Sequence, residues 1–459
     1  MLIKSPSSTP FQEPGNTEQN LKPNNRLCYF LELAVANVHC FGATQTLSMV
    51  DRRGNVANWT ILLGDNGMGK TTLLQCLAGM APKPSSTPPG LAPQFGEFYY
   101  SPKMADYSEW EGTLQRLQGG RASIEIKIAF ERETNQQDRA AIMWGTGGGT
   151  GPMRVKSFYP SAVGDFTIYG YGAMRRLHRV EGDARHADSC ATLFDDNKAL
   201  LDVEQWLRNA DYAATKSETK ASADRLEKVK NLLVQLLPEV SDIRIPAKGN
   251  EIPVPEAKTP FGWVPVRSLS TGYRSVLAWV IDFASRMLDR YPRAKNPFVQ
   301  PAVVLVDQID LFLHPKWQRD MMERLTRIFS KTQFIVTAHS PLIVQAVPDA
   351  NLVLLRRQGS EVHIINQPED IRGWRTDQLL ASDLFEHQPT RDEKTERSME
   401  ERLRLLEKSE LNAREERRLK ELNRQLADIP YGETPEEAEM RAFARRADQS
   451  RCRGYCARR

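Results

Sequence analysis

The sequence of 459 residues predicts an α/β fold in which parallel strands are buried between helices. One observation is a set of short β-branched runs, such as "TILL" at 60–63 and "AVVLV" at 302–306, which suit strands buried on both faces. Another is a glycine-rich segment that follows the first run and precedes an apolar stretch with helical periodicity. A strand, a loop and a helix in this order are typical of folds that bind ligands at one edge of a parallel sheet.

Length and composition narrow the class of protein. A hydrophobic content of 40% supports a core, and the length suits one large domain with insertions or two to three smaller ones. The sequence has no apolar run of about 18 residues and no apolar signal segment, so we expect a cytoplasmic protein without a membrane partner. The six cysteines contain no CxxC pair, which favours reduced thiols.

The glycine-rich segment reads GDNGMGKT and fits the pattern G-x-x-x-x-G-K-[ST] of a phosphate-binding P-loop. Its glycines let backbone N–H groups turn inward, and the following helix directs the positive end of its dipole at the phosphates. We expect Lys70 to reach the β and γ phosphates of ATP, and Thr71 to bind Mg²⁺. The expected nucleotide-binding residues of this loop are Asp65, Asn66, Gly67, Met68, Gly69, Lys70, Thr71 and Thr72.

Two later strands each lead to a polar residue. Asp307 follows the run at 302–306, and we expect it beside the P-loop as a second Mg²⁺ residue, which is the Walker B role. The next residue is Gln308, at the position where a general base would act on the attacking water. The strand "QFIVTAHSP" at 333–341 places His339 where an imidazole would contact the γ-phosphate, so we expect a switch role for it.

The segment LSTGYRS at 269–275 precedes a long helix with apolar periodicity. Ser270, Thr271 and Gly272 would present free N–H groups and a hydroxyl to an anion, although the same residues also fit an ordinary serine N-cap. Together with the elements above, this segment resembles the signature motif of ABC-type ATPases. In that superfamily the signature binds the γ-phosphate of ATP held by the opposing subunit, so the resemblance implies a homodimer or higher homo-oligomer that closes on ATP.

The branch of this superfamily is indicated by three further segments. "LELAVANVHCFGATQTLSM" at 31–49 is similar to the opening strands of SMC, RecF and OLD-like ATPases, and "VDQIDLFLHP" and "TAHSP" are similar to later motifs of the same branch. The resemblance covers residues 26 to 355. Transporters are a poor alternative, because no segment that would engage a membrane domain is recognisable.

Gln308 departs from the pattern of this branch, which has a glutamate after the Walker B aspartate. An amide cannot accept a proton from water, and the loss of a general base costs on the order of 10²- to 10⁴-fold in rate. We therefore expect this chain to bind ATP and to hydrolyse it poorly. Two explanations stay open: a naturally degenerate ATPase, or a deliberate substitution that traps the ATP-bound state.

Narrower resemblance lies in "IYGYGAMRRL" at 168–177, "ATLFDDNKALLDVEQWLRNADYA" at 191–213 and "TDQLLASDLF" at 376–385. These segments are similar to the ATPase subunits of Septu and retron-associated anti-phage systems. That resemblance implies a regulatory ATPase with an HNH-type nuclease subunit as partner, and contact with DNA or RNA through the complex. The alternative is a stand-alone DNA-repair ATPase of the RecF or SMC kind, which would bind DNA directly through arginine clusters.

The expected organisation has three regions: a disordered leader at 1–25, an ABC-type ATPase domain at 26–390, and a C-terminal helical arm with a basic tail at 391–459. Within the ATPase domain we expect a P-loop lobe at 26–190, a helical lid and signature region at 191–290, and the Walker B and His-switch strands at 301–355. The arm is expected to be a helical hairpin that is either solvated or docks a partner.

Two arginines in the segment at 168–177 have an open role. Arg175 and Arg176 would meet phosphate or the partner subunit, or would only be solvated.

Overall fold

The computed structural model describes residues 28–84, 100–102, 122–131, 137–145, 168–175, 188–216, 220–247, 252–368, 370–387, 391–408 and 411–427. Three features expected from the sequence lie outside these residues: the leader at 1–25, the side chain of Arg176, and the basic tail at 440–459.

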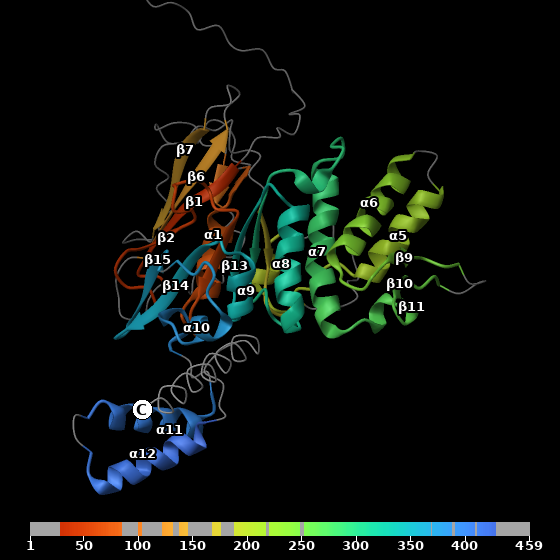
Figure 1. Cartoon of the computed structure of the whole chain (residues 1–459). Helices are drawn as coiled ribbons and strands as arrows, with labels where there is room; N and C mark the ends of the chain where they lie inside the picture. The colour runs from red at the N-terminus through yellow and green to blue at the C-terminus, as the bar shows by residue number, and fades with distance from the viewer. Residues whose placement is uncertain are drawn as a thin grey trace, which may run out of the picture.

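A six-stranded sheet forms the centre of the main domain, which we call the head (Figure 1). Its strands run in the order β15 (Glu361–Asn366), β14 (Asn351–Gln358), β3 (Trp59–Leu63), β13 (Thr332–Thr337), β12 (Ala302–Val306) and β8 (Ile168–Tyr171). Every neighbouring pair is parallel except β14 and β15, which are antiparallel. The parallel pairing aligns the carboxyl ends of β3, β12 and β13 at one edge of the sheet, where the polar residues of the sequence motifs follow them.

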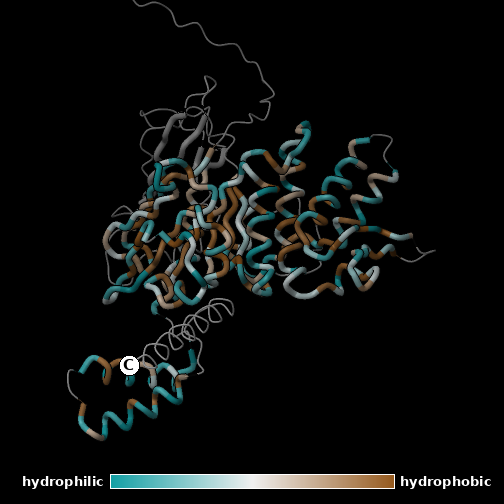
Figure 2. Tube along the Cα trace, in the orientation of Figure 1, coloured by the Kyte–Doolittle hydropathy of each residue, from teal (hydrophilic) through white to brown (hydrophobic). Residues whose placement is uncertain are grey.

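The central strands separate two hydrophobic cores. Val304 and Val306 of β12 belong to one core, while Val303 and Leu305 belong to the other, because successive side chains of a strand point to opposite faces. The second core contains most of the buried side chains of α1 (Lys70–Met80), and Leu193 of a short helix packs into it as well. The first core is covered by α5 (Val203–Lys216), α6 (Lys220–Leu236), α7 (Thr271–Arg290), α8 (Pro315–Ile328) and α9 (Pro341–Ala346). Figure 2 shows the apolar residues gathered in the sheet and the helices beside it.

A second, antiparallel sheet lies on the α1 side of the head (Figure 1). It contains β2 (Gln45–Ser48), β1 (Cys28–Ala36), β6 (Ser123–Glu131) and β7 (Gln137–Gly145), in that order. The buried side chain of Gln333 joins the two sheets, since it donates to the Phe30 carbonyl at 2.8 Å and accepts from the Phe30 N–H at 2.9 Å. These two hydrogen bonds lie where the register of the β1–β6 pairing shifts, between Phe30 and Glu32.

Shorter elements complete the head. A short hairpin pairs β4 (Pro82–Pro84) with β5 (Tyr100–Pro102), and α4 (Ala191–Phe194) follows β8 along the chain. Ahead of α7, a three-stranded sheet contains β11 (Gly262–Pro265), β10 (Glu256–Thr259) and β9 (Asp242–Arg244), and α10 (Thr376–Leu380) packs against α9.

The C-terminal residues form a helical hairpin of α11 (Glu393–Leu406) and α12 (Ala413–Gln425). Arg418 donates to Glu401 at 2.6 and 2.8 Å, and Lys408 donates to Glu415 at 2.6 Å, so the two helices are antiparallel. Figure 1 shows this hairpin apart from the central sheet, and Figure 2 shows that its surface is mostly hydrophilic. Across the described ranges, the helices are all too short or too polar to cross a bilayer.

Candidate nucleotide site

The P-loop connects the carboxyl end of β3 to the start of α1. Gly64, Gly67 and Gly69 have φ values of +137°, +79° and +80°, which are backbone conformations that favour glycine. Space is also restricted at Gly69, where an added Cβ would lie 2.6 Å from the sulfur of Cys40. The loop therefore needs glycine for its backbone curl and for its contact with the segment between β1 and β2.

Lys70 is the first residue of α1 and is only 6% exposed. Its ammonium donates to the Gly64 carbonyl at 2.6 Å and to the Asp65 carbonyl at 2.8 Å. Because an ammonium has three donors, one donor is left for a phosphate oxygen. Burial lowers the pKa of Lys70, while the carboxylates of three aspartates act in the opposite direction: Asp307, Asp65 and Asp310.

Asp307 directly follows β12 and is 4% exposed. The Thr71 hydroxyl donates to its Oδ2 atom at 2.8 Å, and the Thr337 hydroxyl donates to its Oδ1 atom at 2.5 Å. The structure thus brings together the two residues that the sequence assigned to Mg²⁺, although they are 236 positions apart. Thr337 was not predicted; the only signal for it is a polar residue at the end of the buried strand β13.

Gln308 is held in an unusual conformation, with φ at +48°. Its N–H donates to the Thr337 hydroxyl at 2.7 Å, and its carbonyl accepts from Arg175 at 2.7 Å. The left-handed backbone is thereby fixed on both sides, at the position where the sequence indicated a general base.

His339 lies two residues after the end of β13 and is exposed. Its backbone N–H donates to the Oδ2 atom of Asp310 at 3.0 Å. Burial lowers the pKa of His339, the ammonium of Lys70 lowers it further, and nearby carboxylates oppose both effects. The imidazole is therefore on the same edge of the sheet as the P-loop and is favoured in its neutral form.

The signature residues lie at the start of α7. Ser270 is the N-cap and accepts from the Tyr273 N–H at 3.5 Å, and both Ser270 and Thr271 are exposed. An added Cβ on Gly272 would lie 2.6 Å from the carbonyl oxygen of Phe312, so glycine allows α7 to approach the turn after β12. Within the ranges that the structure describes, no hydrogen bond or ion pair joins these residues to the P-loop of the same chain.

Arg175 follows β8 and is buried, with 5% of its surface exposed. The guanidinium donates to the carbonyls of Asp307 and Gln308 at 2.5 and 2.7 Å, and to the Ser275 hydroxyl at 3.3 Å. The expectation that Arg175 meets phosphate, a partner subunit or solvent was wrong, because protein atoms surround the side chain. The sequence contained no signal for these contacts, which join segments 100 or more positions apart.

Comparisons with known proteins show which families this chain resembles. Residues 192–345 match the family model described as "AAA domain, putative AbiEii toxin, Type IV TA system". The chain is 29% identical over 210 residues to a retron Ec83 probable ATPase of Escherichia coli, covering 46% of this chain and 36% of that protein. It is 26% identical over 346 residues to the Septu protein PtuA of Bacillus mycoides, covering 72% of this chain and 41% of that protein. The matched segments thus span less than half the length of these relatives.

The chain has the fold of an ABC-type ATPase head and resembles these relatives. The segments expected to form the P-loop, the Walker B strand and the signature helix lie around one parallel sheet. Among solved structures, an SMC head domain from Thermotoga maritima is 14% identical with a TM-score of 0.37, covering 73% of this chain and 98% of that domain.

The oxygen atoms around the P-loop of this ABC-type ATPase fit Mg²⁺ carried by a nucleotide. Thr71 and Asp307 offer hard oxygen ligands, and the Oδ1 atom of Asp310 is buried without a hydrogen-bond partner in the described structure. Mg²⁺ is commonly held by one or two protein oxygens together with phosphates and waters. Accordingly, Thr71 and Asp307 would hold the ion, which would neutralise charge on the phosphates when bound.

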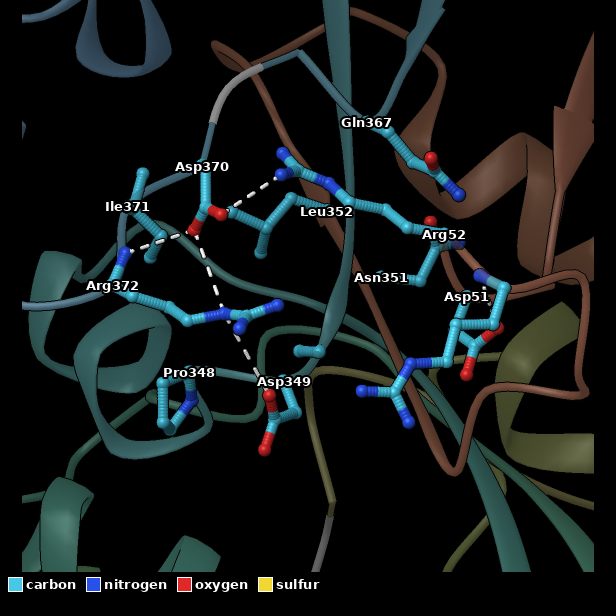
Figure 3. A pocket seen from close by; sticks show the side chains of 12 residues that line it. Asp51, Arg52, Pro348, Asp349, Asn351, Leu352, Gln367, Asp370, Ile371 and Arg372 are labelled. Atoms are coloured by element: carbon cyan, nitrogen blue, oxygen red, sulfur yellow. Dashed lines mark hydrogen bonds and ion pairs between the residues drawn. The ribbon is translucent and has the colours of Figure 1, made fainter.

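A separate pocket of about 220 Å³ lies at the opposite edge of the sheet (Figure 3). It surrounds the start of β14, and β14 is parallel to β3, so the pocket is at the amino ends of the strands and away from the P-loop. Arg52 pairs with Asp370 at 3.0 Å, and Arg372 lies 3.6 Å from the same carboxylate (Figure 3). These pairings indicate a structural junction and give no support for a second nucleotide site.

Proposed function

We propose that this chain is an ATP-binding and ATP-hydrolysing subunit of the ABC type. The observation that carries the proposal is the bond of 2.8 Å between Thr71 and Asp307, which places the P-loop helix against the Walker B strand. Lys70, buried beside them, supplies a positive charge for the β and γ phosphates. Family resemblance suggests ATPase activity, and the hydroxyl, carboxylate and ammonium groups at this edge are those that Mg²⁺ and ATP require.

The signature acts across a dimer in this proposal. Ser270 and Thr271 are exposed at the N-terminus of the 20-residue helix α7, where unpaired N–H groups and the helix dipole favour an anion. Among the described positions, no hydrogen bond or ion pair joins these residues to their own P-loop. A second copy of the chain would therefore bring its bound ATP to this helix, so that each nucleotide is shared between two subunits.

Gln308 limits hydrolysis in this proposal. The backbone of Gln308 is held on both sides by Thr337 and Arg175, so a glutamate would occupy the same place. A carboxylate there would accept the proton of the attacking water, and the amide cannot. The chain with Gln308 would hold ATP in a closed dimer for longer than the chain with glutamate.

We further propose that the ATPase controls an HNH-type nuclease in anti-phage defence, in the cytoplasm. Support comes from its similarity to Septu and retron proteins. The hairpin of α11 and α12 offers a docking arm, because its described residues are largely hydrophilic and only Leu405, Leu422 and Leu426 among them are buried. DNA or RNA would be contacted through the assembled complex.

The decisive experiment compares this chain with its Gln308→Glu variant. We expect both to bind ATP with similar affinity, and the variant to hydrolyse it on the order of 10²- to 10⁴-fold faster. Lys70→Ala in each background is the control, and it should abolish ATP binding because it removes the phosphate-binding ammonium. Equal turnover by the two chains would refute the proposed role of Gln308. Absence of ATP binding would refute the proposed function as a whole, and tight, salt-sensitive DNA binding by the isolated chain would favour a repair ATPase.

A further inference from the structure

Arg175 lies at the junction of three segments that carry the parts of the ATPase head. It follows the edge strand β8, which pairs with the Walker B strand β12 through Tyr171 and Val306. Its guanidinium reaches the two carbonyls of the turn after β12 and the hydroxyl of Ser275 in α7. Ser275 is five residues after the N-cap Ser270, so it is in the part of α7 that carries the signature.

The two terminal nitrogens of the guanidinium serve different segments of this junction. Nη2 donates to both carbonyls of the turn and Nη1 donates to Ser275, and the rigid plane that joins these nitrogens sets a spacing that a single ammonium nitrogen cannot reproduce. Burial lowers the pKa of Arg175 to about 10, while Asp307 and Asp310 favour its charged form, so the group stays protonated at neutral pH. The protein therefore places a buried cation beneath the Walker B turn without exposing it to nucleotide.

The three bonds of Arg175 differ in length. Those to the Asp307 and Gln308 carbonyls measure 2.5 and 2.7 Å, while the bond to Ser275 measures 3.3 Å. The arginine also has a left-handed backbone, with φ at +38°, and its Nε atom is buried without a hydrogen-bond partner in the described structure. The guanidinium is thus bound firmly to the turn and loosely to the helix, so movement of α7 changes the weakest bond first.

We propose that Arg175 is a positioning residue that couples the signature helix to the turn carrying Asp307 and Gln308. The inference rests on the proposed ATPase function. When a nucleotide of the opposing subunit engages the N-terminus of α7, the Ser275 hydroxyl shifts relative to the guanidinium. The guanidinium then adjusts the Gln308 backbone, so that the residue at the base position is aligned only in the closed dimer. Arg175 would affect the hydrolytic step and leave ATP binding almost unchanged.

The test uses the full chain with Gln308→Glu as the active reference. Arg175→Lys should lower kcat by about 10- to 100-fold, as loss of an orienting partner commonly does, with little change in the KM for ATP. In Arg175→Ala, millimolar guanidinium ion should restore part of the lost kcat by occupying the vacated space. Ser275→Ala should lower kcat less, and it should have little further effect when combined with Arg175→Lys, because the two residues act through one contact.

Arg286→Lys is the matched control. Arg286 is a largely buried arginine of α7, and it donates to Asp282 of the same helix at 2.8 Å. Its replacement should lower stability without a specific loss of kcat and without a response to guanidinium ion. If Arg175→Lys lost stability and kcat only as much as Arg286→Lys does, and guanidinium ion rescued nothing, the coupling role would be overturned.

A readout independent of hydrolysis separates this inference from the proposed function. ATP should slow amide hydrogen exchange at 271–276 in the unsubstituted chain, and Arg175→Lys should remove this effect although ATP still binds. If the Gln308→Glu reference binds ATP but fails to hydrolyse it, the proposed role of Gln308 fails, and the exchange result alone supports or overturns the coupling. If the unsubstituted chain binds no ATP, the proposed function fails and the coupling fails with it.

Discussion

The hydroxyl of Thr337 donates to the carboxylate of Asp307 at 2.5 Å, between two adjacent strands of the central sheet. The same hydroxyl accepts from the Gln308 N–H at 2.7 Å. Thr337 thus fixes the orientation of the Walker B carboxylate and the start of the turn after it, and it is completely buried. In the proposed Mg²⁺ site, a carboxylate that is held in this way would not need to be ordered when nucleotide binds.

Replacement of Thr337 by valine keeps the shape of the side chain and removes both hydrogen bonds. We expect Thr337→Val to lower the free energy of unfolding by about 1–3 kcal/mol, since the Gln308 N–H is left without its partner. ATP affinity in the presence of Mg²⁺ should also fall, as measured by calorimetry. Thr337→Ser retains the hydroxyl and is the control, so equal Mg²⁺-dependent affinities in the valine and serine variants would contradict this role.

Alanine substitutions at two glycines of the P-loop would distinguish the cost of backbone strain from the cost of a steric clash. Gly67 and Gly69 have nearly equal φ values, +79° and +80°, but an added Cβ meets nothing within 4 Å at Gly67 and lies 2.6 Å from the Cys40 sulfur at Gly69. Gly67→Ala should cost about 1–2 kcal/mol through left-handed strain. Gly69→Ala should cost about 1–3 kcal/mol more through overpacking. Denaturant unfolding without nucleotide measures both, and equal losses would contradict the close contact.

The lowered pKa of His339 gives a pH dependence with a defined sign. Because its folded-state pKa lies below its ordinary value of about 6.5, protonation favours the unfolded chain. The contribution of neutral His339 to stability is complete above the unfolded-state pKa, and it is lost as pH falls through the folded-state pKa. A His339→Gln variant should lack this part of the pH dependence in unfolding measurements.

NMR titration should show the His339 pKa rising when ATP binds, because phosphate charge favours the imidazolium. An unchanged pKa would place His339 away from the nucleotide.

Mixing two inactive chains tests whether the signature acts in trans. In the Gln308→Glu background, Lys70→Ala removes the P-loop ammonium and Ser270→Arg blocks the signature. Each variant alone should be inactive, but a mixed dimer contains one intact composite site. Half of the dimers in an equal mixture are mixed, and one site of two is intact, so about a quarter of the sites should hydrolyse ATP. No recovery in a mixture shown to exchange subunits would mean that the signature acts within its own chain.

The C-terminal hairpin should be required for partner binding and dispensable for ATP binding. Deletion of residues 391–459 should leave ATP affinity unchanged and abolish capture of a co-expressed HNH-type nuclease, together with phage protection. A finer control exchanges the charges of the ion pair between Arg418 and Glu401, whose atoms lie 2.6 Å apart. Arg418→Glu should loosen the hairpin, and adding Glu401→Arg should restore it and the capture. If the deleted chain still captured the nuclease and protected cells, docking would have to occur on the ATPase head.

The local motifs could be predicted from the sequence because their chemistry depends on contiguous residues. Eight adjacent residues from Gly64 set the curl of the P-loop, and glycine alone readily adopts its positive φ values. The apolar runs of β3, β12 and β13 also indicated a parallel sheet, whose geometry aligns their carboxyl ends. The proximity of Thr71 and Asp307 follows from this alignment, so it could be expected before the structure was known.

From the amino-acid pattern we thus predicted the α/β class, a P-loop, a Walker B aspartate and the positions of Gln308 and His339 beside them. The side chains that support these residues became evident from the folded chain alone. Thr337 and Arg175 bond to the Walker B turn from 29 to 133 positions away, and Arg175 is buried where its sequence context indicated a phosphate, a partner or solvent. The burial and hydrogen bonds of a polar side chain depend on which groups lie next to it in the folded chain. Those neighbours come from packing between distant segments, so the spacing of residues within a motif does not predict them.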